Sequence, residues 1–157
     1  MKKDLNLRIL RPEDLGPILA FARHRLSLQN KDPMERQFAE WSAPWRTESL
    51  AHYLGTGWSF AATETENNQE QILGFTLAQP LLFIRSFTQT IWVEHLDFQN
   101  EETGKALVET LYRWSRDKHM QKLVFTDAEQ AAGLASPYPG QRTREGWWEL
   151  ATTRIKS

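Results

Sequence analysis

The sequence predicts a single α/β (α+β) domain in which a mixed central β-sheet is flanked by helices. Segments with the two-residue period of a strand alternate along the chain with segments whose apolar residues recur at helical spacing. This alternation is typical of a sheet that carries helices on its faces. The length of 157 residues matches one compact domain with a sizeable core.

The N-terminal third of the chain shows clear strand and helix patterns apart from one stretch. Apolar and polar residues alternate over 5–9, as in a half-buried strand. A proline and two acidic residues then suit the first turn of a helix, which apolar residues at helical spacing continue to Leu26. Residues 27–46 lack a clean period and predict a loop with one or two helical turns. A short helix is expected over 47–54, before a glycine.

Three β-rich runs follow in the middle of the chain. Residues 58–65 and 72–78 flank a polar turn at 66–70 and are expected to form a β-hairpin. A third run covers 88–98, and strict alternation predicts that its side chains divide between two faces. One face would hold Ile91, Val93, His95 and Asp97, and the other would hold Trp92, Glu94, Leu96 and Phe98.

The C-terminal part predicts one long helix and two more strands. Asn100 is expected to cap a helix that continues to residues 116–118, and a short buried strand covers 123–126. Prolines and a glycine within 127–145 limit that stretch to irregular structure or a short helix. The chain closes with a strand that runs from 146 to Ile155. Because no closing helix follows, we expect this strand at an open sheet edge where a homodimer would pair.

Composition and missing motifs exclude several classes of protein. Apolar residues make up 40% and charged residues 25%, as in soluble globular proteins, so we expect a cytoplasmic location and no membrane partner. The absence of cysteine excludes disulfides and thiol nucleophiles. The 19 basic and 20 acidic residues give a net charge of −1, so nucleic acid is not an expected partner. The four histidines lack the spacing of metal ligands, so no metal is expected. The sequence also contains no phosphate-binding loop, no dinucleotide-binding motif and no α/β-hydrolase motif.

Residues 91–127 resemble the central part of the GNAT N-acetyltransferases. The run I-W-V-E-H-L-D-F is similar to the family's fourth strand, and G-K-A-L is similar to the start of its pyrophosphate-binding helix. Earlier in the chain, L-N-L-R-I-L-R-P-E-D-L and I-L-G-F-T-L-A are similar to the first strand and helix and to the third strand. The spacing from Gly74 through Phe83 to Glu94, and the ending R-E-G-W-W-E-L, look most like the diamine (spermidine/spermine) acetyltransferases. The resemblance covers nearly all of residues 1–157 as one acyltransferase domain.

This resemblance implies that an acetyl group moves from acetyl-CoA to a small primary amine, with no covalent enzyme intermediate. In this family two splayed strands hold the pantetheine arm, and backbone N–H groups at a helix N-terminus bind the pyrophosphate. The implied donor site consists of Leu96, Asp97, Phe98, Asn100, Thr103, Gly104 and Lys105. The implied catalytic residues are Glu94, as base or ammonium anchor, and Tyr138, as the acid for the thiolate, while Trp41, Trp45 and Phe83 would form aromatic walls for the acceptor.

The loop before the long helix departs from the family pattern. It is shortened, and Glu101 and Glu102 stand where a diphosphate would sit, so like charges would face each other. An alternative function is therefore a catalytically inactive GNAT-fold binding or regulatory domain that has lost CoA binding. Ordinary structural roles also stay open for the other candidates. Glu94 would be a strand-edge carboxylate, Tyr138 a packed turn residue, and His95 with at least two of Trp41, Trp45 and Phe83 would belong to the core.

Overall fold

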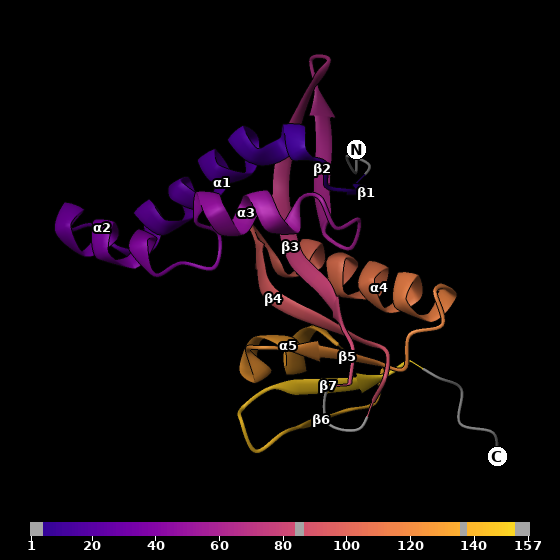
Figure 1. Ribbon diagram of the computed structural model, residues 1–157. Helices are drawn as coiled ribbons and strands as arrows, with labels where there is room; N and C mark the ends of the chain where they lie inside the picture. The colour runs from indigo at the N-terminus through magenta and orange to yellow at the C-terminus, as the bar shows by residue number, and fades with distance from the viewer. Residues whose placement is uncertain (1–4, 84–86, 136–137, 153–157) are drawn as a thin grey trace.

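One twisted β-sheet of seven strands runs through the structure, and helices lie on both of its faces (Figure 1). The computed structural model describes residues 5–83, 87–135 and 138–152, so Ser136, Pro137 and Ile155 lie outside the described residues. The strand order is β1-β2-β3-β4-β5-β7-β6. The predicted fold class, a mixed central sheet flanked by helices, is confirmed.

The observed elements follow the predicted order with two additions. The strands are β1 (Asn6–Ile9), β2 (Phe60–Glu66), β3 (Gln69–Leu81), β4 (Thr90–Phe98), β5 (Lys122–Phe125), β6 (Gly140–Arg142) and β7 (Trp148–Ala151). The helices are the 3₁₀ turn η1 (Pro12–Asp14), α1 (Leu15–Gln29), α2 (Pro33–Trp41), α3 (Thr47–Tyr53), α4 (Glu101–Asp117) and α5 (Ala128–Leu134). The additions are the full helix α2 and the short strand β6. The sequence predicts only a loop with one or two helical turns where α2 forms, and irregular structure or a short helix where β6 forms.

The sheet is antiparallel except at its centre. Strands β1 to β4 pair as antiparallel neighbours, β4 and β5 are parallel, and β7 is antiparallel to β5. Strand β6 pairs with the other side of β7 and forms the sheet edge. The expectation that the last strand lies at an open edge is therefore wrong, because β6 covers it. A homodimer through the edge of β7 loses its structural basis.

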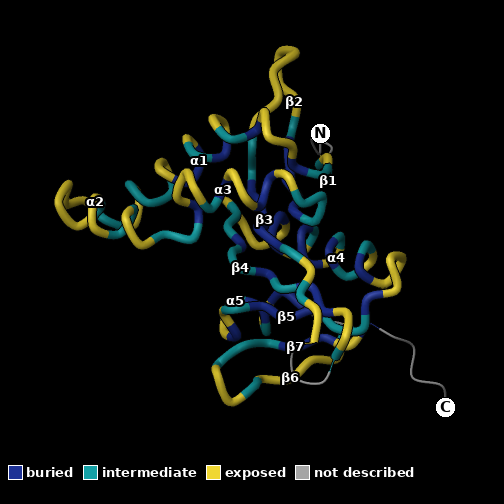
Figure 2. Tube along the Cα trace, in the orientation of Figure 1, coloured by how far each residue is buried: buried dark blue, intermediate teal, exposed yellow. Residues whose placement is uncertain are grey.

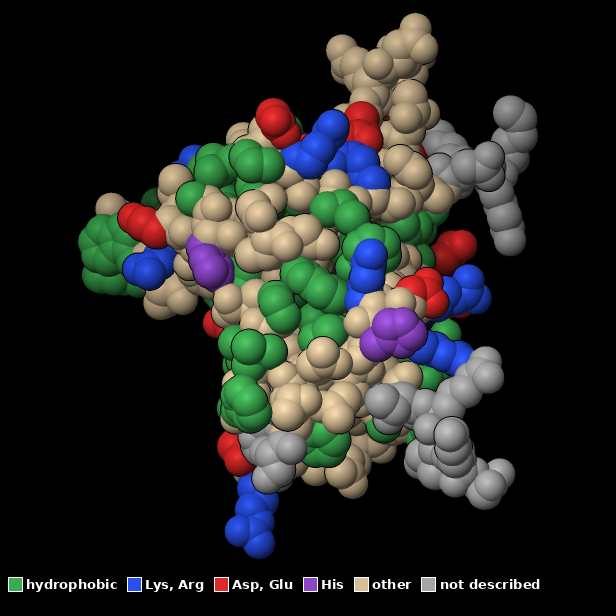
Figure 3. All heavy atoms as spheres, turned by 45° about the vertical axis from the view of Figure 1, so that its right-hand side comes forward, with side chains coloured by type: hydrophobic (Ala, Val, Ile, Leu, Met, Phe, Trp, Pro, Cys, Tyr) green, Lys and Arg blue, Asp and Glu red, His purple; other side chains and the backbone are tan. Residues whose placement is uncertain are grey.

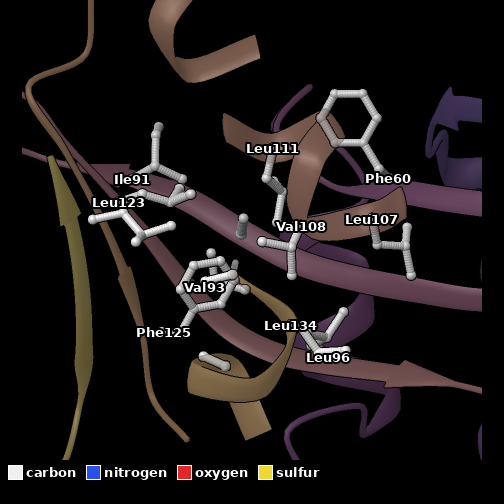
Figure 4. Close-up of a cluster of buried hydrophobic side chains, with 14 of the residues drawn as sticks. Phe60, Ile91, Val93, Leu96, Leu107, Val108, Leu111, Leu123, Phe125 and Leu134 are labelled. Carbon is white, nitrogen blue, oxygen red and sulfur yellow. The ribbon is translucent and has the colours of Figure 1, made fainter. Parts of the chain in front are cut away.

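Two hydrophobic clusters hold helices against opposite faces of the sheet. In the first, α4 and α5 pack on β2 to β5 and β7, and Figure 4 shows Val108 and Leu111 of α4 in this cluster with the strand residues Ile91 and Val93. In the second, α1 and α3 pack on the other face of β2 and β3. Burial of these apolar surfaces supplies most of the drive for folding.

Helix α2 is the exception, because it projects away from the sheet and buries none of its residues (Figures 1 and 2). Met34, Phe38 and Trp41 occupy one side of it and are all exposed. Hydrophobic side chains gather at this end of the molecule in Figure 3. None of the helices in the described part of the chain is both long and apolar enough to cross a membrane.

A buried carboxylate ties the first strand to the first helical turn. Asp14 accepts two hydrogen bonds from the Arg8 guanidinium, at 2.8 and 2.9 Å, and one from the backbone N–H of Arg11 at 2.8 Å. Glu70 on β3 binds the same guanidinium. The hydrogen bonds from Arg8 hold the pKa of Asp14 below its usual range, although burial acts in the opposite direction.

Replacing Asp14 with asparagine is expected to lower the free energy of unfolding by about 2 kcal/mol at neutral pH, because Arg8 loses the more buried of its two charged partners, Asp14, and keeps only Glu70. A carboxyl with a depressed folded-state pKa stabilises the protein above its unfolded pKa of about 3.9, and this stabilisation is lost as the pH falls through the folded pKa. Urea unfolding of the variant and the natural chain should therefore converge in strong acid. The exposed neighbour Glu13, changed to glutamine, is the control. A deficit that is independent of pH would contradict this explanation.

Candidate functional site

The two parallel strands at the centre of the sheet separate halfway along β4. Residues 90–93 of β4 pair with residues 122–125 of β5, and the last main-chain bond runs from the N–H of Thr126 to the carbonyl of Val93 at 3.3 Å. Strand β4 continues to Phe98, whereas β5 ends at Phe125. The edge of β4 from Glu94 to Phe98 therefore has no strand partner on this side.

A β-bulge lies where the strands separate. Leu77 of β3 is opposite His95 and Ala78 is opposite Val93, so Glu94 is the extra residue. The predicted alternation of faces is therefore wrong beyond Val93. Leu96 joins the cluster under α4 and α5, whereas His95 packs against Phe75 in the α1 and α3 cluster.

A small hollow of about 160 Å³ lies beside the free part of β4. Helix α1 forms one wall, and α5 contributes Gln130 from the far side of the gap. The Nε of Arg25 is 3.2 Å from Oδ1 of Asp97, which also accepts the N–H of Phe98 at 2.9 Å. The full lining is Ala22, Arg25, Leu26, Gln29, Trp45, His95, Leu96, Asp97 and Gln130.

His95 is half-buried in the lining of this hollow. Its Nε2 is sealed from solvent and has no hydrogen-bond partner among the residues that the structure describes. The ring lies 5.4 Å from that of Phe75, centroid to centroid. Burial lowers the pKa of His95, and the charges of Asp97 and Glu94 only partly oppose this. The imidazole is therefore neutral near pH 7.

Side chains from the β5–α5 segment occupy the free edge of β4. The hydroxyl of Thr126 donates to the carbonyl of Glu94 at 3.0 Å. The Nε2 of Gln130 donates to the carbonyl of Leu96 at 2.8 Å. Sequence reasoning missed both contacts, because neither residue belongs to a recognisable motif and the separation of the strands is a tertiary feature.

The side chain of Glu94 lies among aromatic residues next to α3. The indole N–H of Trp92 donates to its carboxylate at 2.5 Å, and the Trp92 ring meets that of Trp147 edge-on at 4.8 Å. Burial and the nearby Glu94 carboxylate raise the pKa of Tyr53 to about 12, although a hydrogen bond from Gln79 acts in the opposite direction. Tyr53 therefore stays protonated at neutral pH, next to a carboxylate. None of these aromatic neighbours was predicted as part of the site.

The start of α4 is capped by its own chain. The Asn100 side chain accepts hydrogen bonds from the N–H of Thr103 at 2.9 Å and from its hydroxyl at 3.0 Å, so the predicted N-cap is confirmed. Glu101 and Glu102 in the first turn are exposed, and Lys105 reaches the Glu101 carboxylate at 3.5 Å. Only the first two amides of the helix remain for a ligand, beside two carboxylates.

Two of the predicted donor-site residues also pack against each other. Gly104 lies under the Phe98 ring, and a β-carbon at this position would be 3.0 Å from three ring atoms. The glycine of the G-K-A-L run is therefore required for close packing of α4 on β4, and a ligand is not needed to explain it.

The remaining candidates do not lie together. The Tyr138 ring stacks on Tyr112 of α4 at 3.8 Å and packs on the α4 and α5 cluster, across the sheet from Tyr53. Trp45 is buried and lines the hollow with His95, whereas Trp41 is 58% exposed and lines a separate hollow by α2. Phe83 is 77% exposed. One of the three aromatic residues is thus in the core, where at least two were expected.

Known proteins share this architecture. The sequence matches no family model and no curated protein sequence. An agmatine N-acetyltransferase, as an apo mutant, aligns with a TM-score of 0.64 and 13% identity over 94% of this chain and 98% of that chain. The PaiA N-acetyltransferase from Thermoplasma acidophilum, in complex with coenzyme A, aligns with a TM-score of 0.63 and 14% identity over 94% and 99%. A polyamine N-acetyltransferase from Drosophila melanogaster aligns with a TM-score of 0.60 and 16% identity over 88% and 85%.

Proposed function

We propose that this chain, whose fold is that of the GNAT N-acetyltransferases, transfers an acetyl group from acetyl-CoA to a small primary amine. The observation that carries the proposal is the separation of β4 from β5 at a bulge, with a hollow beside the unpaired edge. Such an edge offers backbone groups to an extended amide chain such as the pantetheine arm. A structural neighbour holds coenzyme A, which supports the same ligand here.

The acceptor amine would bind beside Glu94. A carboxylate flanked by Trp92 and Tyr53 attracts an ammonium group through its charge and through the aromatic rings. Glu94 then removes a proton, and the neutral amine attacks the thioester carbon. The C–S bond breaks as the new C–N bond forms, and the nitrogen loses a second proton, which balances the proton that the thiolate takes up. Tyr53 is better placed than Tyr138 to supply it, because Tyr138 stacks on Tyr112 on the opposite face.

A second candidate is a non-catalytic domain of the same fold, and the start of α4 favours it. Asn100 already satisfies one amide of the first turn, and the carboxylates of Glu101 and Glu102 oppose a diphosphate at the remaining ones. This domain would keep the sheet and the hollow without binding a nucleotide.

Calorimetric titration with acetyl-CoA separates these two functions. The transferase should bind acetyl-CoA with a Kd below about 100 μM and should release free thiol when a diamine such as agmatine or spermidine is added. The same titration with a nucleotide that lacks the pantetheine arm controls for non-specific binding. If the titration shows no heat of binding at millimolar acetyl-CoA, the transferase is excluded and the non-catalytic domain remains.

A further inference from the structure

The Gln130 side chain closes the gap between the separated strands. It extends from α5, and its Nε2 donates to the Leu96 carbonyl at 2.8 Å. The two polar backbone groups of a strand residue point to the same side, so the N–H of Leu96 faces the same gap. Gln130 therefore takes one of the two groups that a neighbouring strand would pair at this position.

Two further features indicate that the gap is built to hold a ligand. The hollow of about 160 Å³ adjoins Gln130 and Leu96. Nε2 of His95 is buried in the lining without a hydrogen-bond partner among the described residues. An unsatisfied buried polar atom destabilises the folded state, and a bound hydrogen-bonding group would remove this cost.

We propose that Gln130 is a displaceable plug, and that an amide-bearing linear arm binds along β4 by replacing the Gln130 carboxamide on Leu96. This inference rests on the proposed function, which supplies such an arm in pantetheine. One amide of the arm donates its N–H to the Leu96 carbonyl, and the oxygen of a second amide accepts the N–H of Leu96, because the N–H and C=O of a single trans amide point in opposite directions. The arm thus pairs two backbone groups where Gln130 pairs one. A group that lacks an amide leaves the Leu96 carbonyl unpaired, so the plug selects for amide-bearing arms.

The test is Gln130→Ala, measured by titration with acetyl-CoA, with pantetheine and with 3′-phosphoadenosine diphosphate, the nucleotide half of CoA. In the Gln130→Ala variant, acetyl-CoA and pantetheine should bind about 3- to 10-fold more tightly. This gain in affinity corresponds to the hydrogen bond from Gln130 to Leu96, which the ligand no longer has to break. The nucleotide half should bind unchanged, because the plug contacts only the arm. Gln71→Ala is the matched control, since Gln71 is exposed on β3 and does not line the hollow.

Each outcome separates the plug from the proposed function. If the natural chain and the Gln130→Ala variant bind acetyl-CoA equally, the proposal that Gln130 is a plug is wrong, and the proposed donor site stands. If only Gln130→Ala binds, the plug is supported and the natural chain is not an acetyl-CoA enzyme. If neither binds, both proposals are wrong. Gln130→Met, which keeps the side-chain length but removes the donor, should show the same gain, so the test does not depend on how the alanine variant folds.

Discussion

Replacing Glu94 with glutamine is expected to lower the kcat/KM for amine acetylation by about 10²- to 10⁴-fold, the usual contribution of a positioned general base. Glutamine keeps the size of the side chain and an acceptor for the Trp92 indole N–H, so the loss would come from charge and basicity. Initial rates of thiol release at saturating acetyl-CoA, measured across pH, provide the readout.

The same measurement distinguishes the two roles open for Glu94. An unchanged kcat with a raised KM would mean that the carboxylate holds the ammonium group equally in the ground and transition states. A lower kcat with a similar KM would assign the proton transfer to it. Glu109→Gln is the control, because Glu109 is exposed on α4 and pairs with Arg113 in the next turn. A Glu94→Gln rate within twofold of the natural chain would exclude both roles.

Local patterns were sufficient to predict most of the fold. The cap at Asn100 and the apolar repeat of α4 are properties of a few neighbouring residues and appear in the structure as expected. Helix α2 was underestimated for a physical reason. Its apolar residues, Met34, Phe38 and Trp41, do not pack on the domain, so their pattern has no clear relation to the core.

The site was harder to predict because tertiary features build it. The bulge at Glu94 reverses the faces of the residues that follow, and nothing in E-H-L-D-F marks the extra residue. Gln130 reaches Leu96 across 34 positions of sequence, and Tyr53 comes to Glu94 from a different helix. Each of these contacts depends on how α3 and α5 pack on the sheet.

Removing the two carboxylates at the start of α4, by Glu101→Gln with Glu102→Gln, is expected to lower the Kd for acetyl-CoA by about 10-fold or more. A unit charge about 7 Å from a phosphate charge interacts strongly enough at an effective dielectric near 20 to change affinity by about this factor. Both side chains are exposed, so salt screens part of the effect. Calorimetric titrations at low and high salt should therefore show the gain shrink as salt rises.

A matched pair of changes separates this local effect from net charge. Glu109→Gln with Asp117→Asn removes two charges from the middle and the end of the same helix, where both side chains are exposed, and should leave the Kd nearly unchanged. Pantetheine, which has no diphosphate, should bind both double variants equally. If the change at Glu101 and Glu102 has no effect on acetyl-CoA, the phosphates do not bind at this helix start. The donor would then be held by the free edge of β4 alone, where Leu96 meets Gln130.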